Sequence, residues 1–390
     1  MQIFRNNTQL SYAERINMKV LNGDFTDIEP NYPIESLLEE DETQEDILFI
    51  DIETTGLTPE NSNLYMIGAA YFKDNGWHYI QWLAEKYEEE LQILKAFAEF
   101  SDRFKLLIHY NGNRFDLPYL IKKREQFSLV FDLERFRGID IYRRISGYRD
   151  ILGLPDVKQK TIESFLGLDR EDVYSGGELI SKYHDFVCYG EQKLLTELIL
   201  HNREDIKGML ICTSMLAYPD MFLKPIRVMG VRANYYDDAR KKRCQEIIMK
   251  LRFTSPLPKP FSFRGMGCYF SGNGLDGVLK VPLYEEEMKY FYANFRDYYY
   301  LPAEDISIHK SIATFVDKEH RIQAKAANCY TRKKSHFLPQ WDVIFSPFYK
   351  REYKSKEIFF ELTDEFKTSR SGFNLYAEHV LSAMFEYGER

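Results

Sequence analysis

Two closely spaced carboxylates end the first strongly apolar segment of the chain. Residues 47–56 read Ile-Leu-Phe-Ile-Asp-Ile-Glu-Thr-Thr-Gly, so Asp51 and Glu53 follow a run of four apolar residues. Side chains two residues apart point the same way in a strand, and we expect both carboxylates to project side by side. Burying like charges costs free energy unless a positive charge lies between them. Hard divalent cations such as Mg²⁺ prefer carboxylate oxygens, so this spacing indicates a metal site.

A further carboxylate lies at a predicted strand-to-helix junction. The apolar segment 105–110 is followed by Asn-Gly-Asn-Arg-Phe-Asp-Leu-Pro, which places Asp116 next to Phe115 and just before Pro118. Proline suits the first turn of a helix, so a helix is predicted to begin here. Aspartate is also a favoured helix N-cap, and Asp116 alone is explained equally well by that structural role.

A histidine and an aspartate share one face of the longest predicted helix, residues 194–216. His201 and Asp205 are four residues apart, and this spacing puts both side chains on the same helix face. Taken alone, the pair is better explained as an exposed polar patch.

The elements that must position these residues follow an α/β pattern from residue 47 onward. Apolar and alternating segments predict strands at 47–52, 64–72, 77–83 and 105–110, and helical periodicity predicts helices at 88–104, 117–125, 160–167, 177–189 and 194–216. The fold class expected for this part is a mixed β-sheet flanked by helices.

A second domain is predicted beyond the prolines at 219 and 225. Short β-branched or aromatic segments there, among them 268–271, 277–282, 311–316, 321–330 and 357–362, are typical of a mainly antiparallel α+β domain. We therefore predict three parts, which are a polar leader with one short helix at 1–45, an α/β domain at 46–218 and an accessory domain at 225–390.

The charge of the chain is unevenly distributed. The net charge is −8, but residues 1–220 carry 24 basic and 39 acidic residues, whereas residues 221–390 carry 28 and 21. The acidic run before residue 73 is explained most simply as a solvated, poorly ordered leader. The positive second half suits contact with a polyanion.

The composition is that of a globular protein without a membrane anchor. Hydrophobic residues make up 44% of the 390 residues and charged residues 29%, and no apolar run reaches the length of a transmembrane helix. The first residues lack the pattern of a signal peptide. The five cysteines have neither metal-site nor disulfide spacing, so we predict a reducing, cytoplasmic location.

The order of the three motifs resembles the DEDD, or DnaQ-like, exonuclease superfamily, whose fold is RNase H-like. The strand with Asp51 and Glu53, the segment ending in Asp116 and the helical pair of His201 and Asp205 occur in the order of that superfamily. The segments at 154–168 and 175–178, with Asn-Arg-Glu-Asp at 202–205, are similar to the YprB-like branch of predicted nucleases. The resemblance covers residues 46–216.

The resemblance implies a two-metal site that holds Mg²⁺ or Mn²⁺. Asp51 would bridge both ions, Glu53 and Asp205 would hold one of them, and Asp116 would hold the other. His201 departs from the pattern, because relatives with a histidine base place it five residues before the last aspartate and those with a tyrosine place it four before. At this spacing His201 would be the proton acceptor, and a surface histidine paired with a neighbouring acid is the alternative.

The predicted substrate contacts are Thr54, Asn111 and Phe115 within the motifs, together with Lys158 and Lys160, because lysine often contacts phosphates. For each lysine taken alone, a solvated surface is the better explanation. In the second half, basic clusters at 240–243 and 332–334 lie near aromatic stretches, a combination that suits single-stranded nucleic acid, although most of those aromatics are expected to be core residues.

The function expected from these motifs is a two-metal nuclease. We expect hydrolysis of phosphodiester bonds in single-stranded DNA or RNA, with a 3′-to-5′ exonuclease polarity that follows from the resemblance alone. Two alternatives remain, a catalytically silent nucleic-acid-binding module on a nuclease fold and a nucleotide phosphohydrolase.

Overall fold

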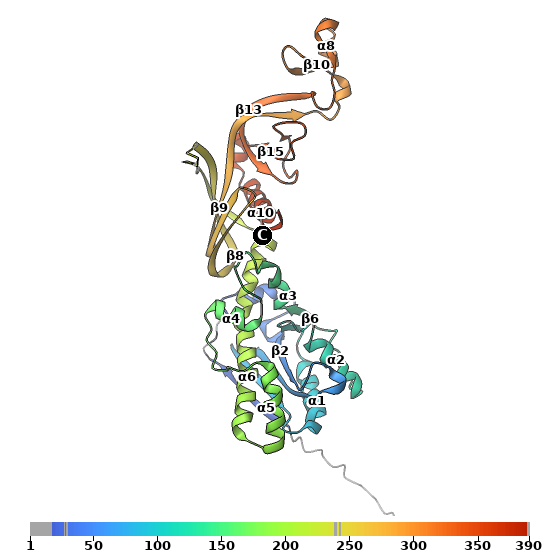
Figure 1. Cartoon of the computed structure of the whole chain (residues 1–390), viewed down its shortest axis with the longest axis vertical. Helices are drawn as coiled ribbons and strands as arrows, with labels where there is room; N and C mark the ends of the chain where they lie inside the picture. The colour runs from blue at the N-terminus through green and yellow to red at the C-terminus, as the bar shows by residue number, and fades with distance from the viewer. Residues whose placement is uncertain (1–17, 27, 29, 238–239, 242, 388–390) are drawn as a thin grey trace, which may run out of the picture. The chain divides into compact units, whose positions relative to one another are not determined.

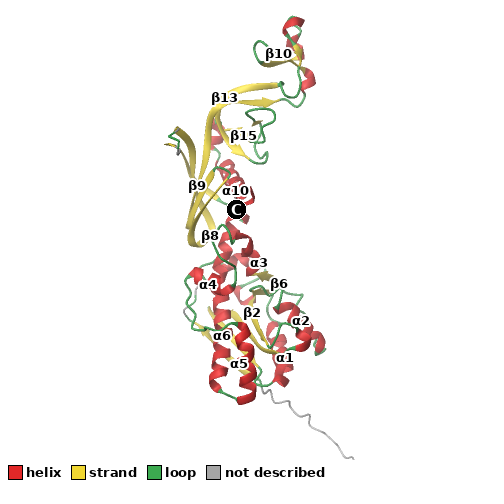
Figure 2. Cartoon of the chain, in the orientation of Figure 1, coloured by secondary structure: helices red, strands yellow, loops and turns green. Residues whose placement is uncertain are grey.

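A computed structural model describes residues 18–26, 28, 30–237, 240–241 and 243–387 of the chain (Figure 1). The chain forms two compact units. The first comprises residues 1–149 and 154–216, and the second comprises residues 150–153 and 217–390. Each unit contains its own β-sheet with helices packed on it (Figure 2).

The first unit is built on a six-stranded mixed sheet with the order β1-β4-β3-β2-β5-β6. The strands are β1 (Lys19–Phe25), β2 (Ile47–Thr54), β3 (Leu64–Lys73), β4 (Gly76–Leu83), β5 (Leu106–His109) and β6 (Arg137–Asp140). The pairs β1–β4, β4–β3 and β3–β2 are antiparallel. The pairs β2–β5 and β5–β6 are parallel. β2 therefore lies at the centre, where seven of its eight residues are buried and only Asp51 is partly exposed.

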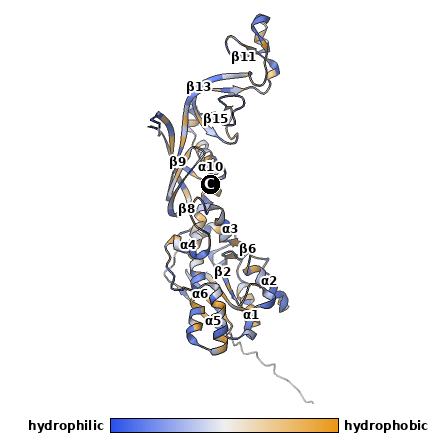
Figure 3. Ribbon diagram, in the orientation of Figure 1, coloured by the Kyte–Doolittle hydropathy of each residue, from blue (hydrophilic) through white to orange (hydrophobic). Residues whose placement is uncertain are grey.

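Helices cover both faces of this sheet. They are α1 (Glu90–Ser101), α2 (Asp116–Gln126), α3 (Ile141–Ile145), α4 (Gln159–Leu166), α5 (Gly176–Tyr189) and α6 (Gln192–Cys212). One apolar cluster joins Ile50 and Ile52 of β2 to residues of α1 and α2. Another apolar cluster joins β3 and β4 to α5 and α6. Both of these helices carry apolar and polar residues (Figure 3). Alternate residues of β2 therefore point toward α6.

The second unit is built on a six-stranded antiparallel sheet with the order β14-β15-β13-β9-β8-β7. Its strands are β7 (Arg227–Asp237), β8 (Arg243–Gly265), β9 (Cys268–Phe291), β13 (Tyr330–Gln340), β14 (Phe348–Tyr349) and β15 (Ile358–Glu361). A small sheet of β10 (Tyr298–Leu301), β11 (Ile306–His309) and β12 (Ile322–Gln323) lies between β9 and β13 in the chain. The helices are α7 (Ala217–Leu223), α8 (Lys310–Ala313), α9 (Asp364–Thr368) and α10 (Arg370–Tyr387).

Part of the predicted leader belongs to the first sheet. β1 pairs along its whole length with β4, and Phe25 packs on Tyr79 with ring centroids 4.9 Å apart. The prediction was wrong for this segment because β1 is an edge strand with one exposed face, so its sequence alternates without a clear apolar signal. Residues 1–17 of the predicted leader lie outside the described residues.

Two further expectations for the second half are corrected. The separate strands predicted at 268–271 and 277–282 are parts of one 24-residue strand, β9, because its irregular pairing with β8 bends the hairpin without ending it. The segment 311–316 was predicted to be a strand, but its first residues belong to the short helix α8 (310–313). His309 accepts a hydrogen bond from the backbone amide of Ser311 at the start of this helix.

Candidate metal-dependent active site

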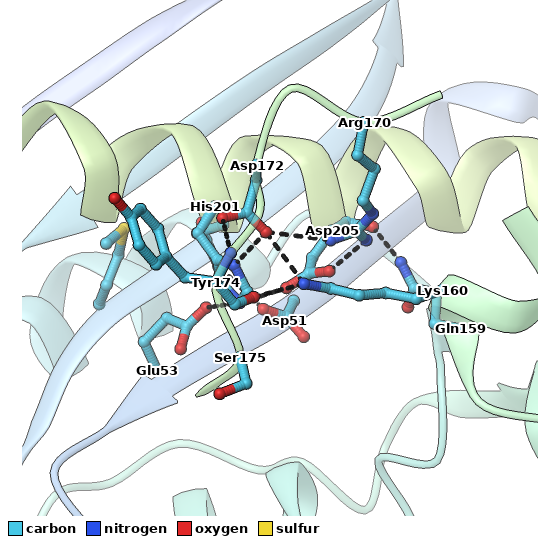
Figure 4. Close-up of polar contacts among 12 residues, drawn as sticks. Asp51, Glu53, Gln159, Lys160, Arg170, Asp172, Tyr174, Ser175, His201 and Asp205 are labelled. Atoms are coloured by element: carbon cyan, nitrogen blue, oxygen red, sulfur yellow. Dashed lines mark hydrogen bonds and ion pairs between the residues drawn. The ribbon is translucent and has the colours of Figure 1, made fainter. Parts of the chain in front are cut away.

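β2 carries the first two carboxylates to the centre of the first unit. Asp51 and Glu53 alternate with Ile50 and Ile52, which pack toward α1 and α2, so the carboxylates point to the opposite face. The hydroxyl of Tyr65 on β3 donates a 3.5 Å hydrogen bond to Glu53. Figure 4 shows both carboxylates on their strand beside the helix that carries His201 and Asp205. The side-by-side arrangement expected from the spacing is present.

α6 brings its polar side chains against this strand. Asn202 is fully buried, and its Nδ2 donates a 2.9 Å hydrogen bond to Asp51 Oδ2. The close approach requires Gly68 on β3, because a Cβ atom there would lie 2.0 Å from Asn202 Oδ1 and 2.2 Å from the Ile206 side chain. A glycine in a strand interior thus marks the point where the helix touches the sheet.

His201 and Asp205 complete the contact between α6 and β2. His201 Nε2 lies 3.0 Å from Asp205 Oδ2 and 3.7 Å from Glu53 Oε1. Candidate ligand atoms of these three residues all lie within 4.8 Å of one another, close enough to share one metal ion. His201 is buried, which excludes the alternative of an exposed polar patch.

The loop after β5 delivers Asp116 to the same place. Asp116 is buried at the first position of α2, and its Oδ1 accepts a 3.3 Å hydrogen bond from the backbone amide of Ile52. Asp140 organises the loop, because its carboxylate accepts hydrogen bonds from the backbone amides of Asn111 (2.9 Å) and Asn113 (3.4 Å). Asn111 itself has a φ of 62°, a conformation that asparagine tolerates better than most residues. Strand, loop and helix thus converge on one carboxylate cluster.

At three carboxylates of the cluster, Asp51, Glu53 and Asp116, burial outweighs any contact with protein cations, and we call these three the strand side. Burial raises the pKa of Asp51 well above its usual range, and the charges of Asp205, Glu53 and Asp116 raise it further. Burial likewise raises the pKa of Glu53 to about 7, although the charge of His201 opposes the shift. Burial raises the pKa of Asp116 to about 7. Buried oxygen donors of this kind fit a hard divalent cation, because such a cation would offset their mutual repulsion.

The remaining groups are compensated by protein cations, and we call His201 and Asp205, with Arg170 and Asp172, the helix side. Arg170 forms an ion pair with Asp205, and His201 Nδ1 lies 2.7 Å from Asp172 Oδ2. Burial acts to raise the pKa of Asp205, yet the hydrogen bond from His201 and the charges of His201 and Arg170 lower it overall. Burial acts to lower the pKa of His201, but Asp205, Glu53 and Asp172 raise it to about 9. His201 is therefore a cation at neutral pH when no metal is bound.

The loop between α4 and α5 supplies the residues that sequence reasoning missed. Arg170 bridges Asp205 and the buried Glu163 of α4, and Gln159 Nε2 donates a 2.7 Å hydrogen bond to the backbone carbonyl of Asp205. Asp172 lies in the charged run Asp-Arg-Glu-Asp at 169–172. That run was the available signal, but its partners are distant in sequence and no periodicity indicates them.

The predicted substrate contacts fall into four environments. Thr54 is buried, and its hydroxyl donates to a backbone carbonyl in the following turn. Asn111 and Phe115 lie in the loop before α2, where Phe115 packs against the core. The Lys160 ammonium lies 3.0 Å from Asp172 Oδ2 and so belongs to the helix side, whereas Lys158 is exposed on the surface. The structure thus links Lys160 to the cluster and leaves Lys158 free to meet solvent.

The comparison with known proteins agrees with this geometry. Residues 48–214 match the family model of the RNase_H superfamily, and this range contains all the carboxylates of the cluster. Residues 48–214 form an RNase H-like domain. The expected fold class is thereby confirmed, and the C-terminal antiparallel unit accompanies it. A sequence search of curated proteins finds no match.

Solved structures that are similar to part of the chain include a DNA polymerase and an exonuclease complex. The family B DNA polymerase from the hyperthermophilic archaeon Pyrobaculum calidifontis has 16% identity and a TM-score of 0.36, with coverage of 45% of this chain and 24% of that chain. The zinc-bound form of the E. coli ExoI–ssDNA complex has 11% identity and a TM-score of 0.27, with coverage of 54% and 55%. The chain thus spans about a quarter of the polymerase and about half of the exonuclease.

Two further observations concern the chain as a whole. No helix within the described ranges is long and apolar enough to cross a membrane. The five cysteines are free thiols.

Proposed function

We propose that the RNase H-like domain is a metal-dependent nuclease of the DEDD type, close to the YprB-like branch. The observation that carries this proposal is the convergence of Asp51, Glu53, Asp116 and Asp205 from a strand, a loop and a helix. The pKa of Asp51 responds to the charges of all three other carboxylates, so the four act as one electrostatic unit. A protein that buries so much negative charge in one place gains most from binding cations there.

The residues present fit two divalent ions, Mg²⁺ or Mn²⁺. Asp51 would contact both, with Glu53 and Asp205 on one and Asp116 on the other. When bound, such ions supply a lowered pKa for the attacking water and charge stabilisation for the leaving oxygen. The backbone amide of Ile52 and the side chain of Asn202 hold Asp116 and Asp51 in place for this task.

In this proposal His201 accepts the proton of the attacking water. Its Nε2 faces Glu53 and Asp205, and its Nδ1 is fixed by Asp172, which orients the ring. The raised pKa of about 9 reflects the carboxylates around it. Positive charge added to the cluster would lower that pKa by repulsion, and would bring His201 toward the range in which a base works at neutral pH.

The finer assignment is a 3′-to-5′ exonuclease that acts on single-stranded DNA or RNA. It rests on the resemblance of the three motifs to the DEDD superfamily. The cytoplasmic location predicted from the cysteines is part of the same proposal.

The test is a gel assay with end-labelled DNA and RNA, each single- and double-stranded, in the presence of Mg²⁺ or Mn²⁺. We expect a ladder of products from single strands, shortened from the 3′ end, and none in EDTA. Free nucleotides tested in parallel address the phosphohydrolase alternative. Absence of cleavage with every substrate and both metals would contradict the proposal.

One observation favours a second candidate, a catalytically silent binding module. Arg170 already neutralises Asp205, so the helix side is stable without a metal. The two candidates differ in metal dependence. A nuclease site should raise the melting temperature on addition of millimolar Mn²⁺, and a silent module should show no shift.

A further inference from the structure

The hairpin of β8 and β9 has one face on which most side chains are polar and at least partly exposed. Its register pairs Ile248 with Arg232 of β7 and with Lys280 of β9, and residues paired in this way lie on the same face. Two residues away on the same face, Glu246 pairs with Asn234. The strands bend along their length, because their register shifts between residues 252 and 261.

The opposite face of the same sheet is covered. Ile247, Met249 and Leu251 are buried. On β8 they alternate with the polar residues Glu246, Lys250 and Arg252 and with Ile248, which is buried as well. Helix α10 contacts β7, β8 and β9, and its Asn374 accepts a hydrogen bond from the backbone amide of Val228 (2.8 Å). The exposed face is therefore not required for the core of the second unit.

Two adjoining hollows lie along the exposed face and meet at one tyrosine. A hollow of about 450 Å³ is lined by residues that include Tyr236, Arg264, Tyr269 and Lys280. A second, of about 490 Å³, is lined by Tyr269 together with polar residues such as Asn273. We call the two hollows together the hairpin groove. Its volume is larger than a single small ion needs and suits a chain of planar groups.

The central tyrosine of the hairpin groove lies between two cations. The Arg264 guanidinium carbon lies 4.7 Å from the centroid of the Tyr269 ring, and the Lys280 ammonium lies 5.8 Å from it. An aromatic ring flanked by cations offers a stacking surface for a base and a charge for the phosphate beside it.

The charge on this face is balanced only in part by the protein. Asp276, which lines the second hollow, is paired with Arg252. Lys280 lies 3.9 Å from Glu246, which offsets part of its charge. Among the residues that the structure describes, Arg232, Lys250 and Arg264 form no ion pair. Unpaired cations beside a half-buried tyrosine ring favour a polyanion with aromatic groups over a neutral or cationic partner.

We propose that the hairpin groove binds single-stranded nucleic acid. Tyr269 stacks on an unpaired base, and Arg264 and Lys280 bind the phosphates on either side of it. A duplex is excluded by this arrangement, because its bases are already stacked and paired. The inference rests on the proposed function, from which it takes nucleic acid as the ligand. It adds a binding site for this ligand in the second unit.

The test measures binding of a fluorescein-labelled oligothymidylate of about 15 nucleotides to the full chain by anisotropy in EDTA. Arg264→Ala with Lys280→Ala should weaken binding roughly tenfold or more, because two charge-assisted contacts are lost. The slope of log K against log salt concentration should fall in magnitude by roughly 1.4. Tyr269→Ala should weaken binding roughly fivefold or more, and Tyr269→Phe should bind as the wild type does, because its ring can still stack.

The matched control is the pair of Arg243 and Tyr235, in which the guanidinium carbon also lies over a tyrosine ring, at 5.0 Å. Tyr235 points to the face opposite Tyr236, so this pair lies outside the hairpin groove. Arg243→Ala should leave binding unchanged. Equal weakening by Arg243→Ala and Arg264→Ala, or equal affinity for a duplex of the same length, would overturn the inference.

The assay separates this inference from the nuclease proposal, because no hydrolysis occurs in EDTA. Binding that depends on Tyr269 and Arg264, in a chain that cleaves nothing with Mg²⁺ or Mn²⁺, would support the groove and contradict the nuclease. Cleavage by a chain whose binding is insensitive to these substitutions would support the nuclease and contradict the groove.

Discussion

The strand side and the helix side of the carboxylate cluster differ in how their charge is compensated. Asp51 and Asp205 are both carboxylates of one site, but the pKa of Asp51 is raised well above its usual range and that of Asp205 is lowered. The difference lies in their neighbours, since Asp205 meets His201 and Arg170 whereas Asp51 meets other carboxylates and the neutral amide of Asn202.

This contrast separates two tasks within one site. The helix side keeps its geometry through protein cations alone, so that α6 and the loop at 167–175 are fixed before any metal arrives. The strand side retains the negative charge that attracts a metal. A site with every acid compensated would bind metal weakly, and one with none compensated would be difficult to fold.

The largest expected effect comes from removing charge on the strand side. Asp51→Asn should lower cleavage by roughly a thousandfold or more, because a bridging ligand is lost while Asn202 can still donate to the new amide oxygen. The same variant should melt at a higher temperature than the wild type in EDTA above neutral pH, because an uncompensated buried charge is gone.

The control for this variant is Asp185→Asn, which changes an exposed aspartate on α5. It should match the wild type in both the gel assay and the melting temperature. Cleavage by Asp51→Asn at the wild-type rate would refute the assigned site.

A smaller loss of rate is expected on the helix side. His201→Ala should lower the rate of cleavage by roughly a hundredfold, the lower end of the range for a general base. The rate of the wild type should rise with pH until His201 is deprotonated, and the variant should lack that rise. Equal rates and equal pH profiles for the two proteins would assign His201 to structure alone.

Replacing Arg170 should lower the stability of the protein, although Arg170 does not belong to the strand side. Its side chain is 8% exposed and that of Glu163 is 1% exposed, so Arg170→Ala leaves a buried acid without its partner. We expect a loss of about 3 kcal/mol in the free energy of unfolding, measured by urea denaturation in EDTA. Lys122→Ala, which breaks the exposed pair with Glu125, should leave the free energy of unfolding close to that of the wild type. Similar losses in both variants would show that the Arg170 ion pairs do not hold the helix side together.

The smallest expected effect is a change in the pH dependence of stability. Glu53 has a folded pKa of about 7 against an ordinary value of 4.5, so its contribution is fully present below about pH 4.5 and is lost as pH rises through about 7. Metal-free wild type should therefore be more stable at about pH 5 than at about pH 8, and Glu53→Gln should reduce that difference. His201, with a pKa of about 9, adds a loss at higher pH. The variant keeps part of this loss, because Asp205 and Asp172 still raise the pKa of His201. An unchanged difference in Glu53→Gln would contradict the assigned pKa.

The sequence was sufficient to predict the strand side because its signals are local. The apolar run before Asp51 predicts a buried strand, and the two-residue spacing predicts that Glu53 shares its face. The junction before Asp116 combines a strand, a turn and a proline within about a dozen residues. Helical spacing alone placed His201 and Asp205 together, and the structure adds that they face β2.

The helix side could not be predicted in the same way. Arg170 meets Asp205 across 35 residues of chain, and no periodicity links them. β1 was missed because one face of this edge strand is exposed to solvent. The length of β8 and β9 was missed because bends at irregular pairing resemble strand ends in sequence. Each of these features depends on tertiary contacts, which a pattern along the chain does not record.

The most direct test of the metal site is a calorimetric titration of the metal-free chain with Mn²⁺ at neutral pH. The two-metal account predicts two ions bound per chain in the wild type and in Asp185→Asn, and fewer than one in Asp51→Asn. Absence of binding at millimolar Mn²⁺ in the wild type, or the same stoichiometry in Asp51→Asn, would contradict it.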